Sequence, residues 1–219
     1  MRLTHLIFDL DGTLIDSSDG VVAAVNYSLT AVGAPPQPAE LIKRHIGYPL
    51  SKMYPHFTDA PFEELYRHFQ TKAAETIVSS THALDGADEV LRRLKNEGYI
   101  LAVATTKVRA HVDGVLERLH WHELFTATVA GDEVPKVKPA PDCFLRALEL
   151  MSAEPANTLV IGDTENDILA AHAVPMTAAA VASPYGGREK VQAAGPDYWL
   201  DTLEDLPALL ATLNIRSAS

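Results

Sequence analysis

Residues 5–13 read HLIFDLDGT, and this stretch decides the fold. Its first four residues form an apolar run that is too short for a helix and is typical of a buried strand. Asp9 follows directly and Asp11 stands two residues further on, so in extended backbone both carboxylates point to the same side. Gly12 permits a tight turn whose N–H groups can face an anion. The stretch therefore predicts a strand that brings two acids and a turn to one point.

Beyond residue 84 short apolar runs alternate with stretches of helical spacing. The runs at 100–104, 127–130, 159–161 and 177–181 predict strands. Helices are predicted around Val90, Leu91 and Leu94 and at 110–119, 141–150, 165–173 and 203–213. This alternation predicts an α/β fold, with a doubly wound parallel sheet covered on both faces. Ligands in such folds bind beyond the carboxyl ends of the strands.

The segment between the first strand and residue 84 has a different pattern. Val21, Val25 and Leu29 recur at helical spacing after a cap at Ser17 or Ser18, and shorter and longer helices are predicted at 40–45 and from Phe62 to Ala73. It contains no convincing strand. We therefore predict a core made of residues 1–15 and 84–219, with an all-helical insert at 16–83.

Composition excludes several classes of protein. The 219 residues are 47% hydrophobic and 21% charged, as in globular proteins. The net charge is −11 and the densest basic cluster is residues 43–45, so we expect no nucleic-acid partner. Cys143 is the single cysteine, which excludes an intrachain disulfide and fits a reducing cytoplasm. Residues 1–9 lack a signal-peptide pattern, and prolines and a Gly pair interrupt the uncharged stretch 168–187, so we expect neither secretion nor membrane insertion.

Two polar motifs follow strand 100–104 in turn. Hydroxyl and N–H groups at Thr105 and Thr106 can hold phosphate oxygens, although threonine is equally an ordinary helix cap. Lys138 precedes Pro139, which favours extended backbone and places the lysine near a helix start, where it can neutralise phosphate or carboxylates. A solvated loop lysine is the plain alternative, and nearby Lys136 serves as the comparison.

A last motif, GDTEND at residues 162–167, follows the strand at 159–161. Asp163 stands at the strand end and Asp167 one helical turn later. With Asp9 and Asp11 they form an oxygen-ligand set suited to Mg²⁺, because neighbouring carboxylates need a cation or a proton between them. Taken alone, the first motif could be a turn with solvated aspartates, and the last could be an aspartate helix cap with a surface acid. An EF-hand fails on spacing, since its glycine would fall on Leu14 or Ile168.

Taken together these motifs resemble the haloacid dehalogenase superfamily, whose four motifs occur in this order. Residues 9–13, Thr105, Lys138 and Gly162-Asp163 with Asp167 match them in turn. The resemblance implies a Rossmann-like core and makes the insert the family's small helical cap. Residues 46–50 and 86–91 are most similar to phosphoglycolate phosphatase-type members.

The resemblance also implies the roles of the site residues. Asp9 would be the nucleophile that takes up the phosphoryl group, and Asp11 would protonate the leaving oxygen and then activate water. Thr105 and Lys138 would hold the phosphoryl oxygens, with Gly12, Thr13 and Thr106 as further substrate contacts. Mg²⁺ would bind Asp9, the Asp11 backbone carbonyl, Asp163 and Asp167. Thr106 stands where the family frequently has Asn.

The expected function is hydrolysis of a small phosphorylated metabolite of the phosphoglycolate type by a monomer or homodimer. A cap-domain phosphomutase shares all four motifs and stays open. A receiver-like module also holds an aspartyl-phosphate, but it has no helical cap. The acid at Asp11 disfavours dehalogenase and phosphonatase chemistry. Arg44, beside the break at Gly47, is the candidate for binding a substrate carboxylate, because its planar fork matches that group; a solvated basic patch is the alternative.

Overall fold

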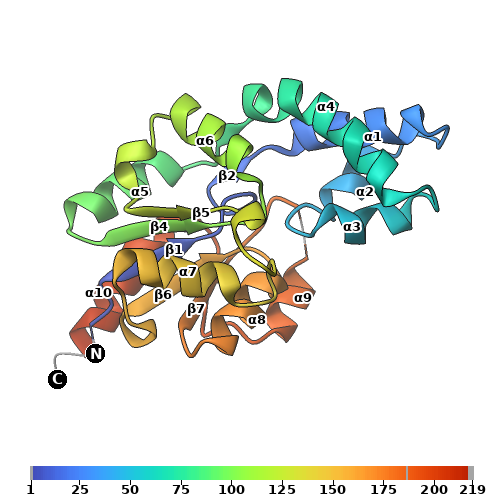
Figure 1. Ribbon diagram of the computed structural model, residues 1–219. Helices are drawn as coiled ribbons and strands as arrows, with labels where there is room; N and C mark the ends of the chain where they lie inside the picture. Colours follow the sequence, from blue (N-terminus) through green and yellow to red (C-terminus); the bar gives the residue numbers. More distant parts are fainter. Residues whose placement is uncertain (1, 186, 217–219) are drawn as a thin grey trace.

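A parallel sheet covered by helices on both faces forms the larger part of the molecule, and a group of helices stands apart at one end (Figure 1). This computed structural model describes residues 2–185 and 187–216. Each strand of the sheet pairs in parallel with its neighbours. The strand order is β5 (Ala127–Val129), β4 (Ile100–Ala104), β1 (His5–Phe8), β6 (Thr158–Gly162), β7 (Thr177–Val181) and β8 (Tyr198–Leu200).

Strand β1 shows why both faces of the sheet are covered. Its side chains alternate, so Leu6 and Phe8 enter one hydrophobic cluster and Ile7 enters another, all with no exposed surface. The first cluster contains residues of α5 (Ala87–Asn96), α6 (Arg109–Arg118) and α10 (Leu206–Arg216). The second contains residues of α7 (Asp142–Met151), α8 (Glu165–Ala173) and α9 (Arg188–Ala193). The predicted doubly wound α/β core is therefore confirmed.

The separate group of helices lies at the upper right of Figure 1, far from both termini. It consists of α1 (Ser18–Ala31), α2 (Ala39–Lys43), α3 (Leu50–Met53) and α4 (Phe62–Ser80). These helices share their own hydrophobic cluster, in which Leu29, Leu65 and Ile77 are buried. We call this group the cap and retain 16–83 as its proposed extent.

Two short strands connect the cap to the core. β2 (Ile15–Asp16) and β3 (His82–Ala83) pair antiparallel, with Asp16 opposite His82. The structure therefore differs from the expectation of no strand within 16–83, because Asp16 and residues 82–83 are in strands. Two-residue strands carry no periodic pattern, and their pairing joins segments from opposite ends of the insert.

The remaining boundaries follow local signals. The predicted elements at 100–104, 165–173 and 177–181 have the bounds of β4, α8 and β7. The final predicted helix is a 3₁₀ turn followed by α10, whereas the short elements β8, α9 and α3 were not predicted. The 3₁₀ turns are Tyr54–His56, His122–Leu124, Gly131–Glu133, Pro155–Asn157 and Leu203–Asp205. Within the described part of the chain, no helix is both long and apolar enough to cross a membrane.

Candidate active site

The three central strands end at one edge of the sheet. β1 lies between β4 and β6, and Phe8 is in register with both Val103 and Ile161. The residues that follow these strands, Asp9, Thr105 and Asp163, therefore emerge side by side, as the strand-end rule predicts. All three side chains are buried.

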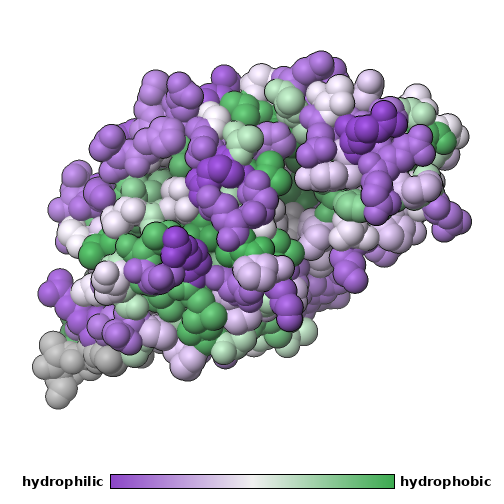
Figure 2. Space-filling view, in the orientation of Figure 1, coloured by the Kyte–Doolittle hydropathy of each residue, from purple (hydrophilic) through white to green (hydrophobic). Residues whose placement is uncertain are grey.

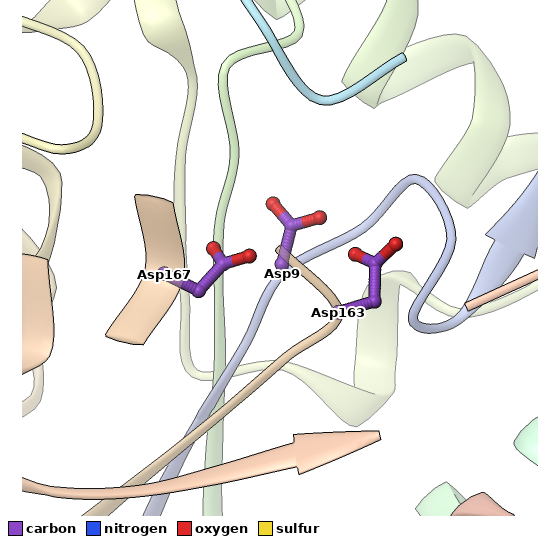
Figure 3. A group of neighbouring side chains, drawn as sticks. All are labelled: Asp9, Asp163 and Asp167. Carbon is purple, nitrogen blue, oxygen red and sulfur yellow. The ribbon is translucent and has the colours of Figure 1, made fainter. Parts of the chain in front are cut away.

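Three carboxylates meet at this edge. One carboxylate oxygen from each of Asp9, Asp163 and Asp167 lies within 4.8 Å of the other two. Figure 3 shows them in a row, with Asp9 between the other two: Asp9 comes from the end of β1, Asp163 from the loop after β6 and Asp167 from α8. No more than 4% of any of these residues is exposed. Such a set of hard oxygen donors is what a divalent cation requires.

Hydrogen bonds fix the two acids of the last motif. Asp163 accepts from the Thr13 hydroxyl at 3.1 Å and from the Ser183 hydroxyl at 2.6 Å. Asp167 accepts from the backbone N–H and the hydroxyl of Thr164, at 3.1 and 2.7 Å, which closes the first turn of α8. The predicted substrate contact Thr13 is thus placed against an acid of the cluster. Ser183 follows β7 and was not predicted, since no motif marks it.

Gly12 is required for this arrangement. Its φ is +86°, and a Cβ built there would lie 2.2 Å from Asp163 Oδ2. A side chain at position 12 would therefore be strained and would displace the Asp163 carboxylate.

Lys138 is the cation of the cluster. Its ammonium forms ion pairs with Asp9 and, at 2.5 Å, with Asp167, and it donates to the Ala104 carbonyl at 3.1 Å. Its side chain is only 3% exposed. Burial alone would lower the pKa of Lys138, but the Asp167 and Asp9 carboxylates outweigh it and raise that pKa above its usual range. Lys136, the comparison residue, is exposed.

One ammonium does not balance three buried carboxylates. If all four groups are ionised, two negative charges are in excess, and burying uncompensated charge is costly. Burial raises the pKa of Asp9 to about 7 although Lys138 opposes the rise, and burial also raises the pKa of Asp163. The cluster thus has the donors and the charge deficit that suit a divalent cation.

Asp11 faces a different pair of partners. Its carboxylate accepts from the Ser17 hydroxyl and pairs with Lys107 Nζ at 3.0 Å, while Lys107 also donates to Ser17 at 3.3 Å. The Asp11 carboxylate is not a member of the acid cluster. The resemblance assigns its backbone carbonyl to the metal, which stays a prediction.

Sequence reasoning missed the roles of two of these residues. Ser17 occupies the cap position of α1, as predicted, but its hydroxyl makes no capping bond and binds Asp11 instead. Lys107 is not among the predicted site residues, yet its side chain is only 6% exposed and pairs with Asp11. Its position directly after two threonines at a strand end was the available signal. Thr105 is buried, and its hydroxyl accepts from the Lys107 N–H at 3.2 Å.

Two cavities lie between the cap and the core. The larger, about 530 Å³, reaches Asp11 and Thr106. The smaller, about 140 Å³, lies on the Asp163 side, and Arg44, which is exposed, lines it. Arg44 does not line the larger cavity. Its binding of a substrate carboxylate stays a prediction. Tyr48 reaches both cavities and donates to Glu165 of α8 at 2.5 Å, which joins the cap to the core.

Known proteins are similar to this chain in sequence and in fold. A family model described as haloacid dehalogenase-like hydrolase matches residues 6–181. The pyrophosphatase PpaX of Bacillus cereus is 31% identical over 217 residues, covering 98% of this chain and 99% of that protein. A predicted phosphoglycolate phosphatase from Haemophilus somnus 129PT has 26% identity and a TM-score of 0.85, covering 95% of this chain and 98% of that chain. A hydrolase from Pseudomonas syringae has 30% identity and a TM-score of 0.80, with the same two coverages. The protein is a member of the haloacid dehalogenase-like hydrolase family.

Proposed function

We propose that the protein is a Mg²⁺-dependent phosphatase that hydrolyses a small phosphomonoester through an aspartyl-phosphate. The observation that carries the proposal is the buried cluster of Asp9, Asp163 and Asp167 around the Lys138 ammonium. It combines a nucleophile, oxygen donors for a cation and a fixed positive charge at the strand ends.

The metal would be held by the Asp9, Asp163 and Asp167 carboxylates together with the Asp11 backbone carbonyl. The excess of negative charge and the all-oxygen donor set favour Mg²⁺. When bound, Mg²⁺ supplies positive charge against the phosphoryl oxygens, and otherwise the net negative charge of the cluster would repel a phosphate dianion.

The reaction divides one displacement into two. An oxygen of Asp9 attacks phosphorus, the bond from phosphorus to the leaving oxygen breaks, and Asp11 gives that oxygen a proton. Water then attacks the aspartyl-phosphate, Asp11 takes a proton from it, and phosphate and free Asp9 are released. Thr105 and Lys138 bind the phosphoryl oxygens throughout.

Two other functions use similar residues. A phosphomutase would return the phosphoryl group to its substrate, and a receiver-like module would keep it on aspartate. The named relatives are hydrolases, one a pyrophosphatase and one a predicted phosphoglycolate phosphatase, which favours transfer to water. Phosphoglycolate and pyrophosphate therefore both belong in a substrate panel. An aspartyl-phosphate that persists far beyond seconds would indicate a signalling module instead.

The test is phosphate release by Asp9→Asn with Mg²⁺ and with excess chelator. We expect the variant to keep the wild-type fold and melting behaviour and to lose turnover, and chelator to abolish wild-type turnover. Asp59→Asn, an exposed cap aspartate, is the matched control and should keep full activity. Substantial turnover by Asp9→Asn in a sample free of contaminating phosphatase would overturn the nucleophile assignment. Full wild-type activity in chelator would overturn the metal requirement.

A further inference from the structure

The larger cavity is placed to receive the leaving group of the substrate. It lies between the cap helices and the strand ends and reaches Asp11, the residue proposed to protonate the leaving oxygen. Its volume of about 530 Å³ is within the roughly 300–1,000 Å³ of small-molecule sites. The cavity beside Asp11 can therefore hold the part of the substrate that is attached to the leaving oxygen.

The side chains that line this cavity from the cap are mainly apolar. Figure 2 shows apolar, green surface in the recess between the core and the cap helices at the upper right. Phe62 stacks on Tyr66, with ring centroids 5.5 Å apart, so an aromatic surface is already formed there. The principal apolar side chains are Ile46, Leu50, Met53, Phe62, Phe69 and Ile77.

The cavity offers little to a charged leaving group. Its charged lining residues are Asp11, Asp132 and Lys107, and no arginine of the described residues lines it. Lys107 already pairs with Asp11 at 3.0 Å and would have to leave that partner to bind another anion. Burial, together with nearby Lys107, lowers the pKa of His111 although Asp11 and Asp132 oppose the shift, so the neutral ring is favoured. A second phosphate or a carboxylate would lose its hydration here without gaining a free cation.

We propose that the preferred substrate is a phosphomonoester of an uncharged, largely apolar or aromatic alcohol. This rests on the proposed phosphatase function. It departs from pyrophosphate and from phosphoglycolate, because the leaving group of each carries negative charge. Burial of an apolar leaving group against the cap supplies binding energy that those two substrates do not use.

The experiment compares kcat/KM for substrates that share a primary alcohol leaving group. 2-Phenylethyl phosphate, ethyl phosphate and phosphoglycolate are measured together with pyrophosphate, all with Mg²⁺. We expect 2-phenylethyl phosphate to exceed each of the others by at least tenfold, as is usual when a hydrophobic pocket is filled. A higher kcat/KM for pyrophosphate or phosphoglycolate would overturn the proposal and leave the phosphatase function intact.

Two variants test the cavity itself. Phe62→Ala should lower kcat/KM about tenfold for 2-phenylethyl phosphate and by a clearly smaller factor for ethyl phosphate, because Phe62 is half-buried and lines the cavity. Phe57→Ala is the control, since Phe57 is a half-buried cap residue outside the lining. Leu50→Arg should shift preference toward phosphoglycolate. Equal losses on both esters in Phe62→Ala would contradict the assignment.

A binding measurement separates this proposal from the proposed function. If the wild type hydrolyses none of the four compounds, the phosphatase function fails. Calorimetry with the non-hydrolysable 2-phenylethylphosphonate and phosphonoacetate then still reports on the cavity. Tighter binding of 2-phenylethylphosphonate supports an apolar ligand, and tighter binding of phosphonoacetate overturns it.

Discussion

Lys138→Met tests how much the Lys138 ammonium stabilises the buried acid cluster. The lysine is 3% exposed and contacts two carboxylates and a carbonyl, so its loss leaves buried charge without a partner. Removing one partner of a buried ion pair costs about 3–5 kcal/mol. At roughly 2–4 °C per kcal/mol for a chain of this length, the melting temperature should fall by about 6–20 °C. Methionine keeps most of the side-chain volume, so loss of charge rather than a cavity dominates.

The assays are thermal and urea unfolding in chelator, both monitored by far-ultraviolet circular dichroism. Lys136→Met, an exposed residue of the same loop, is the control and should change the free energy of unfolding by no more than about 0.5 kcal/mol. Added Mg²⁺ should stabilise Lys138→Met more than the wild type, because the cation supplies the missing positive charge. Similar, small losses in the two variants would refute the reasoning.

Three further predictions concern other parts of the molecule. Gly12→Ala should weaken Mg²⁺ binding in calorimetry and should lower the free energy of unfolding more than Gly33→Ala does. Both glycines have a positive φ, in which a residue with a Cβ costs about 1–2 kcal/mol, but only the Cβ at position 12 would collide with Asp163. Burial raises the pKa of Cys143 to about 11, so iodoacetamide should label it at pH 8 only in denaturant, and rapid labelling of the native protein would contradict its burial. Tyr48→Phe, which removes a hydrogen bond from the cap to the core, should raise KM several-fold with a smaller change in kcat, and an unchanged KM would exclude this contact from substrate binding.

Much of the core could be predicted because its signals are local. The run 100–104 is apolar enough to be a buried strand wherever it lies, and residues 164–167 carry their own capping interactions for α8. The parallel sheet then follows from the alternation of strands and helices. Because parallel strands share one carboxyl edge, the sequence predicts that Asp9, Thr105 and Asp163 lie together.

The partners of each acid could not be predicted in the same way. Asp9 and Asp11 are two residues apart, yet Asp9 joins the cluster around Lys138 while Asp11 binds Ser17 and Lys107. The difference between their partners depends on the turn at Gly12 and on side chains that come from other strand ends. The spacing of residues in the sequence does not predict it.

The sequence by itself determined the class of fold and the order of the chemical motifs, because periodicity and strand-end chemistry are properties of short segments. The tertiary structure alone decided the two-residue strands β2 and β3, the contact between Tyr48 and Glu165, and the apolar cavity beside Asp11. Each of these joins segments that are distant in the chain. They form only when the fold brings these segments together, so no local pattern encodes them.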